Sequence, residues 1–347
     1  MSTFVDPRPF LGRPGPSFGR IEGMLLAGDI GGTKALLGLF SPAEPRPAVV
    51  KVAAFATLEH DSLLDIIARF LERPEHAAIE AACFGVAGPV NEQRATLTNV
   101  PWAVSASDIA SASGIPSVTL LNDLQAMAYA VPVLERDELT VLQPGRAVAG
   151  GNAALIAAGT GLGEALLHWV DGRFVPSPSE GGHADFSART PAEVGLMQML
   201  TSRYGRAEWE HVLSGPGLVN IHRFTHPHGC AVGDLLADPV HAPAIISRAA
   251  LDHRCPQCVE ALAMFVAAYG AEAGNLALRC VSTAGLYIGG GIAPKILPAL
   301  QGPAFLDAFR SKSPLTALLD TIPVAVVGNE QVALLGAAVY ANRARRA

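Results

Sequence analysis

The chain is short of charged residues, aromatic residues and cysteine. Only 16% of its 347 residues are charged and 6% are aromatic, whereas 50% are hydrophobic. That composition is too apolar for a disordered polymer, and 35 Gly with 26 Pro stay below the level of low-complexity sequence. The chain is therefore expected to fold, and its length suits two domains of about 100 to 200 residues each.

The sequence also lacks an excess of positive charge and a long apolar run. Lys and Arg number 25 against 31 Asp and Glu, so the formal net charge is −6. A chain with this charge has no excess of positive residues to bind the phosphate backbone of a nucleic acid. No apolar stretch approaches the roughly 18 to 20 residues that span a bilayer, and the start lacks a signal-peptide pattern. We expect a cytoplasmic protein with no nucleic-acid and no membrane partner.

Cysteine is scarce and irregularly spaced. Five cysteines in a chain of this size are unlike the dense, even sets of small secreted domains, so free thiols are expected. Cys255-Pro256-Gln257-Cys258 is a lone C-x-x-C motif, and its only plausible partners are His226, His228 and Cys230. A tetrahedral site needs four ligands, and this spacing is irregular. The sequence favours no metal bound by side chains, and a structural zinc is the less favoured alternative.

The chain divides into a leader and two α/β units. Residues 1–23 are rich in Pro and Gly and are expected to be disordered. A smaller domain is expected from residues 24–133 plus 324–347, and a larger one from residues 134–323. The fold class is therefore α/β, with two domains and a cleft between them.

Short apolar segments predict the elements of the first unit. Residues 25–29, 35–40 and 48–55 are separated by Gly-rich and Pro-rich breaks, which indicates a three-stranded antiparallel meander. Ser62 precedes Asp65 by three residues at the head of apolar positions with helical spacing, which predicts a capped helix. Residues 81–86 and 117–121 are predicted to be buried strands.

The second unit repeats this order. Strands are predicted at 153–158 and 164–170, around a glycine turn, and at 284–288. Helices are predicted from Thr190-Pro191 to about residue 205, at 259–280 and at 331–345.

Three glycine turns are the candidates for holding a nucleotide. Glycines let backbone N–H groups approach an anion closely, and neighbouring hydroxyl and ammonium groups can add contacts. The alternative is that each turn is only a tight hairpin. Neither a dinucleotide-binding G-x-G-x-x-G opening a helix nor a P-loop is present, and the G-x-S-x-G match at residues 15–19 is interpreted as chance. The candidate nucleotide-binding residues are Asp29, Gly31, Gly32, Thr33, Lys34, Gly159, Thr160, Gly161, Gly290 and Gly291.

Polar side chains after a strand and in an irregular turn are the candidates for chemistry. Asp123 follows a predicted strand, where open α/β sheets place ligand groups, so it is our candidate base. A helix N-cap is the equally plausible alternative, with Asn122 able to take that role instead. Glu180 and His183 flank two glycines, and Glu210 could add a further carboxylate to a sugar-binding set.

Seven motifs in order make the chain resemble the bacterial glucokinase family, within the superfamily of actin-like ATPases that includes hexokinase and Hsp70. They are Asp29-Ile30-Gly31-Gly32-Thr33, Phe84-Gly85-Val86-Ala87-Gly88-Pro89, Leu97-Thr98-Asn99-Val100-Pro101-Trp102, Asn122-Asp123, Gly159-Thr160-Gly161-Leu162-Gly163, Glu180-Gly181-Gly182-His183 and Leu213-Ser214-Gly215-Pro216-Gly217-Leu218-Val219-Asn220. The resemblance implies an actin-like, ribonuclease H-like two-domain fold.

The resemblance also implies an activity. Glucose would receive the γ-phosphoryl group of ATP, with Asp123 as catalytic base and Mg²⁺ arriving with the nucleotide. Asn122, Asp123, Glu180, His183 and Glu210 would contact the sugar, and the three glycine turns would hold the nucleotide. A homodimer is expected by the same likeness. Alternatives are a kinase for another hexose or an amino sugar, or a non-catalytic sugar sensor.

Lys34 departs from the usual Asn of bacterial glucokinases and also occurs in the related repressor and open-reading-frame kinases. That branch typically has a zinc-binding cysteine cluster after its sugar-binding histidine, and its repressors add a helix-turn-helix. The chain shows neither pattern, so the sequence favours the glucokinase branch.

Overall fold

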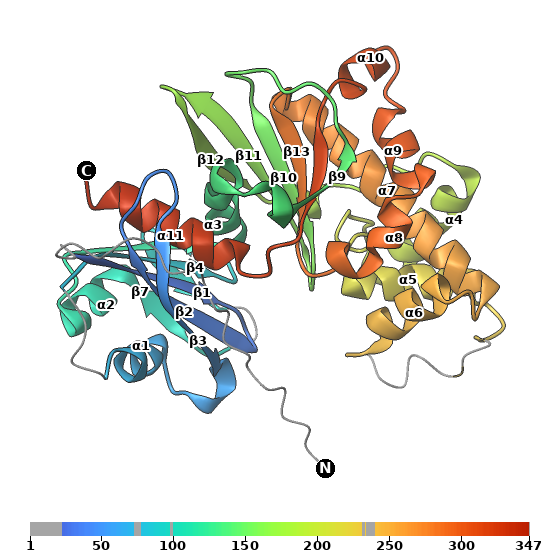
Figure 1. The fold of residues 1–347 in the computed structure, drawn as a ribbon. Coiled ribbons are helices and arrows are strands. Elements are labelled where there is room, and N and C mark those ends of the chain that lie inside the picture. The colour runs from blue at the N-terminus through green and yellow to red at the C-terminus, as the bar shows by residue number, and fades with distance from the viewer. Residues whose placement is uncertain (1–22, 73–77, 98–99, 231–232, 234–239, 347) are drawn as a thin grey trace.

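A computed structural model describes residues 23–72, 78–97, 100–230, 233 and 240–346. The predicted leader, except Gly23, and Thr98-Asn99 of the third motif lie outside the described residues. The molecule is a mixed α/β protein built around two sheets, with helices on both sides of each (Figure 1).

The first sheet has the order β3-β2-β1-β4-β8 and confirms the predicted meander. Its strands are β1 (Met24–Ile30), β2 (Lys34–Ser41), β3 (Ala48–Ala56), β4 (Ile79–Val86) and β8 (Ser117–Asn122). The first three are antiparallel, and β1, β4 and β8 run parallel. Because parallel strands end at the same edge, β1 and β8 deliver their last residues to one side of the domain.

Helices cover both faces of this sheet. The helices α1 (Leu63–Leu71) and α2 (Ala106–Ser113) pack on one face, and α3 (Asp123–Ala130) and α11 (Val332–Ala344) pack on the other. The predicted cap of α1 is confirmed, because the Asp65 N–H donates to Ser62 Oγ at 3.1 Å. A small sheet of β5 (Val90–Asn91), β6 (Arg94–Thr96) and β7 (Ala103–Ser105) extends this domain.

The second sheet repeats the layout of the first and adds one strand. Its order is β12-β11-β10-β13-β14-β9, with β9 (Leu139–Gln143), β10 (Ala153–Ala158), β11 (Leu162–Val170), β12 (Arg173–Ser179), β13 (Gly285–Gly289) and β14 (Val324–Val327). Strands β10, β11 and β12 form an antiparallel meander, and β10, β13 and β14 are parallel. The predicted likeness of the two halves is therefore visible in their strand order.

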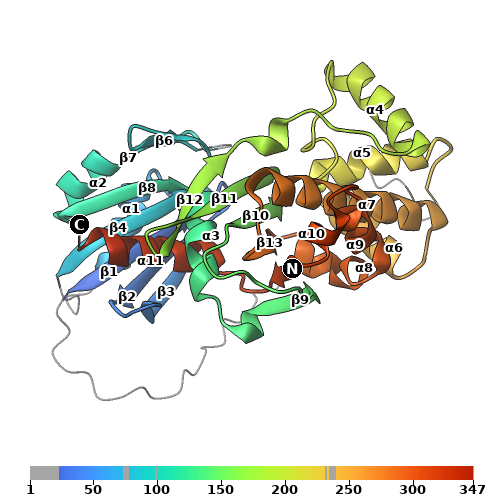
Figure 2. The ribbon, with the colours of Figure 1, turned by 90° about the horizontal axis from the view of Figure 1, so that it is seen from above.

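All six residues of β10, Ala153–Ala158, are buried, and successive side chains face opposite sides of the sheet. Ala154 and Ile156 face the larger core with α7, and Ala153 and Leu155 face a cluster that includes Leu124 and Ala128 of α3. Helix α3 therefore packs against both domains, as its place between the sheets in Figures 1 and 2 shows.

The remaining helices lie on the far side of the second sheet. They are α4 (Pro191–Tyr204), α5 (Gly215–Thr225), α6 (Ala242–Leu251), α7 (Pro256–Cys280), α8 (Leu297–Leu300), α9 (Pro303–Arg310) and α10 (Thr316–Leu319). Among the described residues, α7 is the one helix long and apolar enough to cross a membrane, but 72% of its apolar window is buried. It is a helix of the protein core, stabilised by the sheet and helices around it.

The strand pairing moves one predicted domain boundary. We expected the chain to return to the smaller domain at residue 324, but β14 still pairs with β13 in the second sheet. The return comes at α11, which packs on β1, β4 and α3. A short apolar strand carries no signal for which sheet will accept it, because either edge can satisfy its backbone hydrogen bonds.

Candidate active site

Two carboxylates lie at the carboxyl edge of the first sheet. Asp29 is the penultimate residue of β1, and Asp123 begins α3 directly after β8. Burial is the main cause that raises the pKa of Asp29 to about 6, and the negative charge of Asp123 raises it further. The nearby Lys34 ammonium acts in the opposite direction. The structure therefore brings together the predicted base and two of the predicted nucleotide-binding residues.

Asp123 is a half-buried acid whose carboxyl has lost much of its water and accepts hydrogen bonds from its own turn. Burial raises the pKa of its carboxyl, and the negative charge of Glu180 adds to that shift. The Leu124 N–H donates to Asp123 Oδ1 at 2.8 Å and partly offsets it. A carboxyl with a raised pKa holds an accepted proton more firmly, which suits a general base.

Asn122 takes the cap role that the sequence left open between the two residues. Its Oδ1 accepts from the N–H groups of Leu124 at 3.0 Å and Gln125 at 3.4 Å. Its Nδ2 donates to the carbonyl of Gly88 at 3.2 Å. Asn122 therefore fixes the first turn of α3, on which Asp123 stands, and the cap does not depend on Asp123 alone.

The first glycine turn closes the hairpin of β1 and β2. The Gly31 N–H donates to the Lys34 carbonyl at 3.0 Å, and Thr57 Oγ1 donates to the Gly31 carbonyl at 2.9 Å. Thr33 and Lys34 are exposed. The turn is a tight hairpin, which was the alternative to nucleotide binding in the sequence analysis. It also presents a hydroxyl and an ammonium group to solvent.

The second and third glycine turns meet at the end of β10. The Gly159 N–H donates to the Gly161 carbonyl at 2.8 Å, and the Ile292 N–H beyond the third turn donates to the Ala158 carbonyl at 3.2 Å. Gly290 has φ +83°, and a Cβ there would lie 2.4 Å from the Ala158 oxygen. Only glycine fits that position, so the two turns can share one small surface with exposed Thr160 and with Gly291.

The Glu180 to His183 segment follows β12 and forms a 3₁₀ turn over Gly181–His183. The His183 ring bonds through Nδ1 to Glu208 Oε1 at 3.1 Å, and this contact raises the pKa of His183. The His183 side chain is 51% exposed. Because Nδ1 is occupied, Nε2 is the ring nitrogen left for a ligand.

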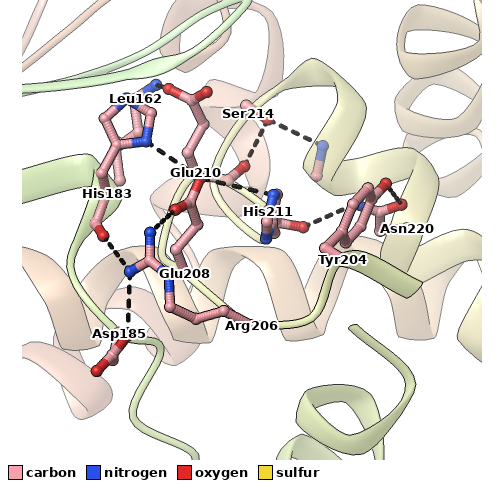
Figure 3. A network of polar contacts seen from close by, with 11 residues as sticks. Leu162, His183, Asp185, Tyr204, Arg206, Glu208, Glu210, His211, Ser214 and Asn220 are labelled. Carbon is pink, nitrogen blue, oxygen red and sulfur yellow. Dashed lines mark hydrogen bonds and ion pairs between the residues drawn. The ribbon is translucent and has the colours of Figure 1, made fainter. Parts of the chain in front are cut away.

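Glu208 was missed by the sequence analysis. It is only 8% exposed, and it bonds to Arg206 Nη2 at 2.5 Å as well as to His183. Arg206 also donates to the His183 carbonyl at 2.7 Å (Figure 3). The sequence analysis selected Glu210 as the sugar-binding acid. Nothing in the local sequence indicates that Glu208, two residues earlier, is the one that contacts His183.

Glu210 connects this network to the second glycine turn. Its Oε2 accepts from the Leu162 N–H at 2.9 Å, and a Cβ on Gly161 would lie 2.5 Å from that oxygen. Gly161 is therefore required for Glu210 to approach the turn. Ser214 Oγ donates to the Glu210 carbonyl at 2.7 Å (Figure 3). The Gly215 N–H donates to the Gly159 carbonyl at 2.8 Å.

The network continues away from the turn through an aromatic pair that the sequence analysis did not select. The Tyr204 ring stacks on His211 with centroids 4.1 Å apart, and Tyr204 Oη donates to Asn220 Oδ1 at 3.0 Å. Asn220 Nδ2 donates to the His211 carbonyl at 3.0 Å, and His211 Nε2 lies 3.5 Å from Glu208 Oε1. These contacts hold Glu208 behind His183.

The ligand atoms of His183, Glu208 and Glu210 lie within 4.8 Å of one another, as metal ligands can. Both Glu208 oxygens already accept hydrogen bonds, from His183 and from Arg206, and Glu210 accepts one from Leu162. Hydrogen bonds therefore satisfy this group. The arrangement suits recognition of hydroxyls, for which carboxylates and imidazole are good partners.

Comparison with known proteins identifies the family. The family model described as Glucokinase matches residues 26–344. The chain belongs to the glucokinase family. It is accordingly an enzyme of the sugar-kinase class.

Glucokinase relatives cover nearly the whole chain. Glucokinase of Nostoc punctiforme is 37% identical over 338 residues, which cover 92% of this chain and 99% of that protein. Glucokinase of Psychromonas ingrahamii is 36% identical, with 91% and 96% covered. The crystal structure of a glucokinase from an Antarctic psychrotroph superposes with a TM-score of 0.82 at 29% identity, over 92% of this chain and 99% of that one. The actin-like ATPase fold predicted from the sequence is confirmed.

Proposed function

We propose that the chain transfers the γ-phosphoryl group of ATP to the 6-hydroxyl of glucose, giving glucose 6-phosphate and ADP. The observation that carries this proposal is the half-buried carboxyl of Asp123 at the start of α3, whose pKa is raised chiefly by loss of water. In this reaction Asp123 accepts the proton of the attacking hydroxyl. Relatives named glucokinase support glucose as the sugar.

The sugar-binding groups come from both domains. On the first domain, Asn122 is proposed to contact the sugar beside Asp123, with its amide held by the Gly88 carbonyl and by a hydrogen bond to the Asp123 carboxyl. On the second, Glu180, His183 and Glu210 offer carboxylates and an imidazole nitrogen. The electrostatic influence of Glu180 on Asp123 supports their closeness. A sugar held by both sets would favour closure of the domains over the reacting atoms and exclude water.

The glycine turns are assigned to the nucleotide. Gly31, Gly32, Thr33 and Lys34 would hold phosphates with Asp29, and Gly159, Thr160 and Gly161 would hold them from the other domain. Gly290 and Gly291 would border the adenosine, since the backbone there leaves no room for a side chain at 290. Magnesium bound to the ATP phosphates supplies charge neutralisation when present. A glucokinase of Streptomyces griseus with the same fold was solved with glucose and AMPPNP, and this supports the assignment.

A coupled assay of ADP release tests the proposal. With ATP and Mg²⁺ fixed, glucose should stimulate ADP release, and the product should be identified as glucose 6-phosphate. A panel with mannose, fructose and glucosamine separates a glucokinase from a kinase for another hexose or an amino sugar. Binding of glucose without ADP release would contradict the proposal and favour a sugar sensor. The homodimer and the cytoplasmic location stay predictions.

A further inference from the structure

One imidazole nitrogen and three cysteine sulfurs lie close together at the C-terminal end of α5 and the start of α7. His226 Nε2 lies 3.3 Å from Cys255 Sγ and 3.7 Å from Cys258 Sγ. Cys230 Sγ lies 3.9 Å from Cys255 Sγ and 3.8 Å from Cys258 Sγ. Donors placed about 2.0 to 2.3 Å from a shared central ion, at tetrahedral angles, are about 3.5 to 3.8 Å apart. The four atoms therefore have the spacing of a tetrahedral thiolate–imidazole site.

We propose that His226, Cys230, Cys255 and Cys258 bind a structural Zn²⁺ ion. Three thiolates and one imidazole in tetrahedral arrangement select zinc among the common cellular divalent ions. Four protein ligands close the coordination sphere, so the ion has no open position for substrate and its role is structural. The sequence analysis did not favour this site, because the spacing along the chain is irregular.

The orientation of His226 supports its role as a ligand. Its Nδ1 lies 2.9 Å from the carbonyl oxygen of His222 and 2.9 Å from Thr225 Oγ1. A backbone carbonyl can only accept, so Nδ1 carries the hydrogen and Nε2 keeps its lone pair. Metal-binding histidines are typically held in this way by a hydrogen bond from the other ring nitrogen.

A disulfide fits the same cysteines less well. Cys230 Sγ is almost equidistant from Cys255 Sγ and Cys258 Sγ, at 3.9 and 3.8 Å, whereas a disulfide requires about 2.05 Å. One disulfide would also leave the third thiol unused. Cys255 and Cys258 are completely buried, as expected of ligands in a closed site.

A fifth residue lies against the cluster and provides an internal comparison. The His222 ring stacks on His226 with centroids 3.8 Å apart, and its side chain is buried without a hydrogen-bond partner for either nitrogen. Its ligand atom lies within 4.8 Å of those of His226, Cys230 and Cys258. His226 has the shorter approach to the thiols and the oriented ring, so the proposal assigns His226 and not His222 to the metal.

The ion would join two helices of the larger domain. His226 directly follows α5, and Cys255 and Cys258 form the N-cap and first turn of α7. The N-terminal end of α5 bonds to Gly159 of the second glycine turn. The ion would therefore hold α5 against α7 at the end opposite to the proposed active site, and its loss should lower stability more than it changes the chemistry.

Metal content and cobalt substitution test the site in the full chain. Protein purified without chelator in the presence of a phosphine reductant, loaded with Zn²⁺ and freed of excess by gel filtration, should hold one zinc per chain by mass spectrometry. Replacement by Co²⁺ should give the intense visible absorption of tetrahedral thiolate cobalt. Removal of zinc with a strong chelator should lower Tm by about 5 °C or more.

Paired cysteine variants separate the cluster from general effects of removing a thiol. Cys258→Ser should lose most of the bound zinc and the cobalt absorption. Cys280→Ser, at the buried far end of the same helix, should retain both. In the same way His226→Asn should lose the metal, and His222→Asn should keep it.

Three results would overturn the proposal. They are a zinc content that is a small fraction of one ion per chain with no cobalt spectrum, a disulfide among these cysteines under reducing purification, or equal metal retention by the paired variants. Loss of metal in His222→Asn but not in His226→Asn would overturn the ligand assignment. These readouts do not depend on kinase activity, so they stand apart from the proposed function.

Discussion

The carboxylates of the two domains differ in how they are stabilised. On the first domain, Asp29 and Asp123 are half-buried at the sheet edge, and their pKa values are raised chiefly by loss of water. On the second, Glu208 and Glu210 accept hydrogen bonds from Arg206, His183 and the Leu162 N–H. A desolvated acid is suited to accept a proton, whereas hydrogen-bonded acids are suited to hold a fixed geometry.

This difference indicates that the two domains have different roles in the proposed reaction. The first domain would supply the base and the second the rigid set that orients the sugar. A substitution that keeps the shape of a side chain but removes its charge should therefore lower kcat when it is made on the first domain. The same kind of substitution on the second domain should weaken glucose binding.

Replacement of Asp123 by Asn should have the largest effect. Asp123→Asn removes the proton acceptor and is expected to lower kcat by about 10² or more, with little change in glucose binding. Steady-state kinetics and glucose titration by calorimetry measure the two quantities separately. Asp108→Asn is the control, because Asp108 also stands in the first turn of a helix after a strand but is exposed. Near wild-type turnover in Asp123→Asn would remove Asp123 from the role of base.

Replacement of Glu208 by Gln should mainly weaken sugar binding. Glu208→Gln weakens the charge-assisted contact that orients His183, and a loss of about 1.4 kcal/mol corresponds to a tenfold higher Kd for glucose. The pKa of His183 should fall toward its ordinary value, because the Glu208 contact is the largest cause of its rise. Glucose titration and NMR titration of the histidine measure these changes.

Asp185→Asn is the matched control for Glu208. Asp185 contacts the same Arg206 guanidinium at 3.1 Å, but its side chain is 80% exposed. Exposed ion pairs contribute about 0 to 1 kcal/mol, so little change is expected. If Glu208→Gln lowered kcat as much as Asp123→Asn does and left the Kd for glucose unchanged, the proposed difference in role between the two domains would be wrong.

Neutralisation of Glu180 should move the pH dependence of the reaction. As base, Asp123 must be ionised, so kcat/KM should fall as the pH drops through its raised pKa. The negative charge of Glu180 contributes to that rise. Glu180→Gln should therefore lower the pKa of Asp123 and shift the acidic limb of the kcat/KM profile to lower pH. Exposed Glu260→Gln should leave the limb in place, and a shift to higher pH in Glu180→Gln would contradict the electrostatic account.

Glu164 should produce a small pH dependence of stability. It is buried beside Glu272 and Arg279, and burial followed by the Glu272 charge raises its pKa. The folded state thus binds a proton that the unfolded state releases, so stability is highest below the ordinary pKa of glutamate and falls as the pH rises through the raised value.

The test of Glu164 is the slope of Tm against pH. Glu164→Gln should reduce the fall in Tm between about pH 5 and pH 9, because the neutral amide has no proton to lose. Glu80→Gln, which neutralises an acid paired with Arg345 near the surface, should leave the slope almost unchanged. An unchanged slope in Glu164→Gln would show that the carboxyl titrates normally in the folded state.

Site residues could be predicted from the sequence where the contacts that define them are between residues close together in the chain. Asn122, Asp123 and the glycine turns were found because a strand, a turn and a cap are signalled by adjacent residues. Glu208 was missed, because its importance comes from His183, 25 residues away in sequence, and from Arg206. Glu208 lies in the turn between α4 and α5, and an acid there has no local signal that separates a buried partner of histidine from an exposed charge.

The order of strands and helices, the glycine turns and the family could all be predicted from residues close together along the chain. The sheet that accepts β14, and the meeting of His226 and Cys230 with Cys255 and Cys258, became visible only in the folded molecule. Both depend on the packing of α5 against α7 and of one strand beside another. Such packing follows from burial of surfaces formed by residues far apart in the chain.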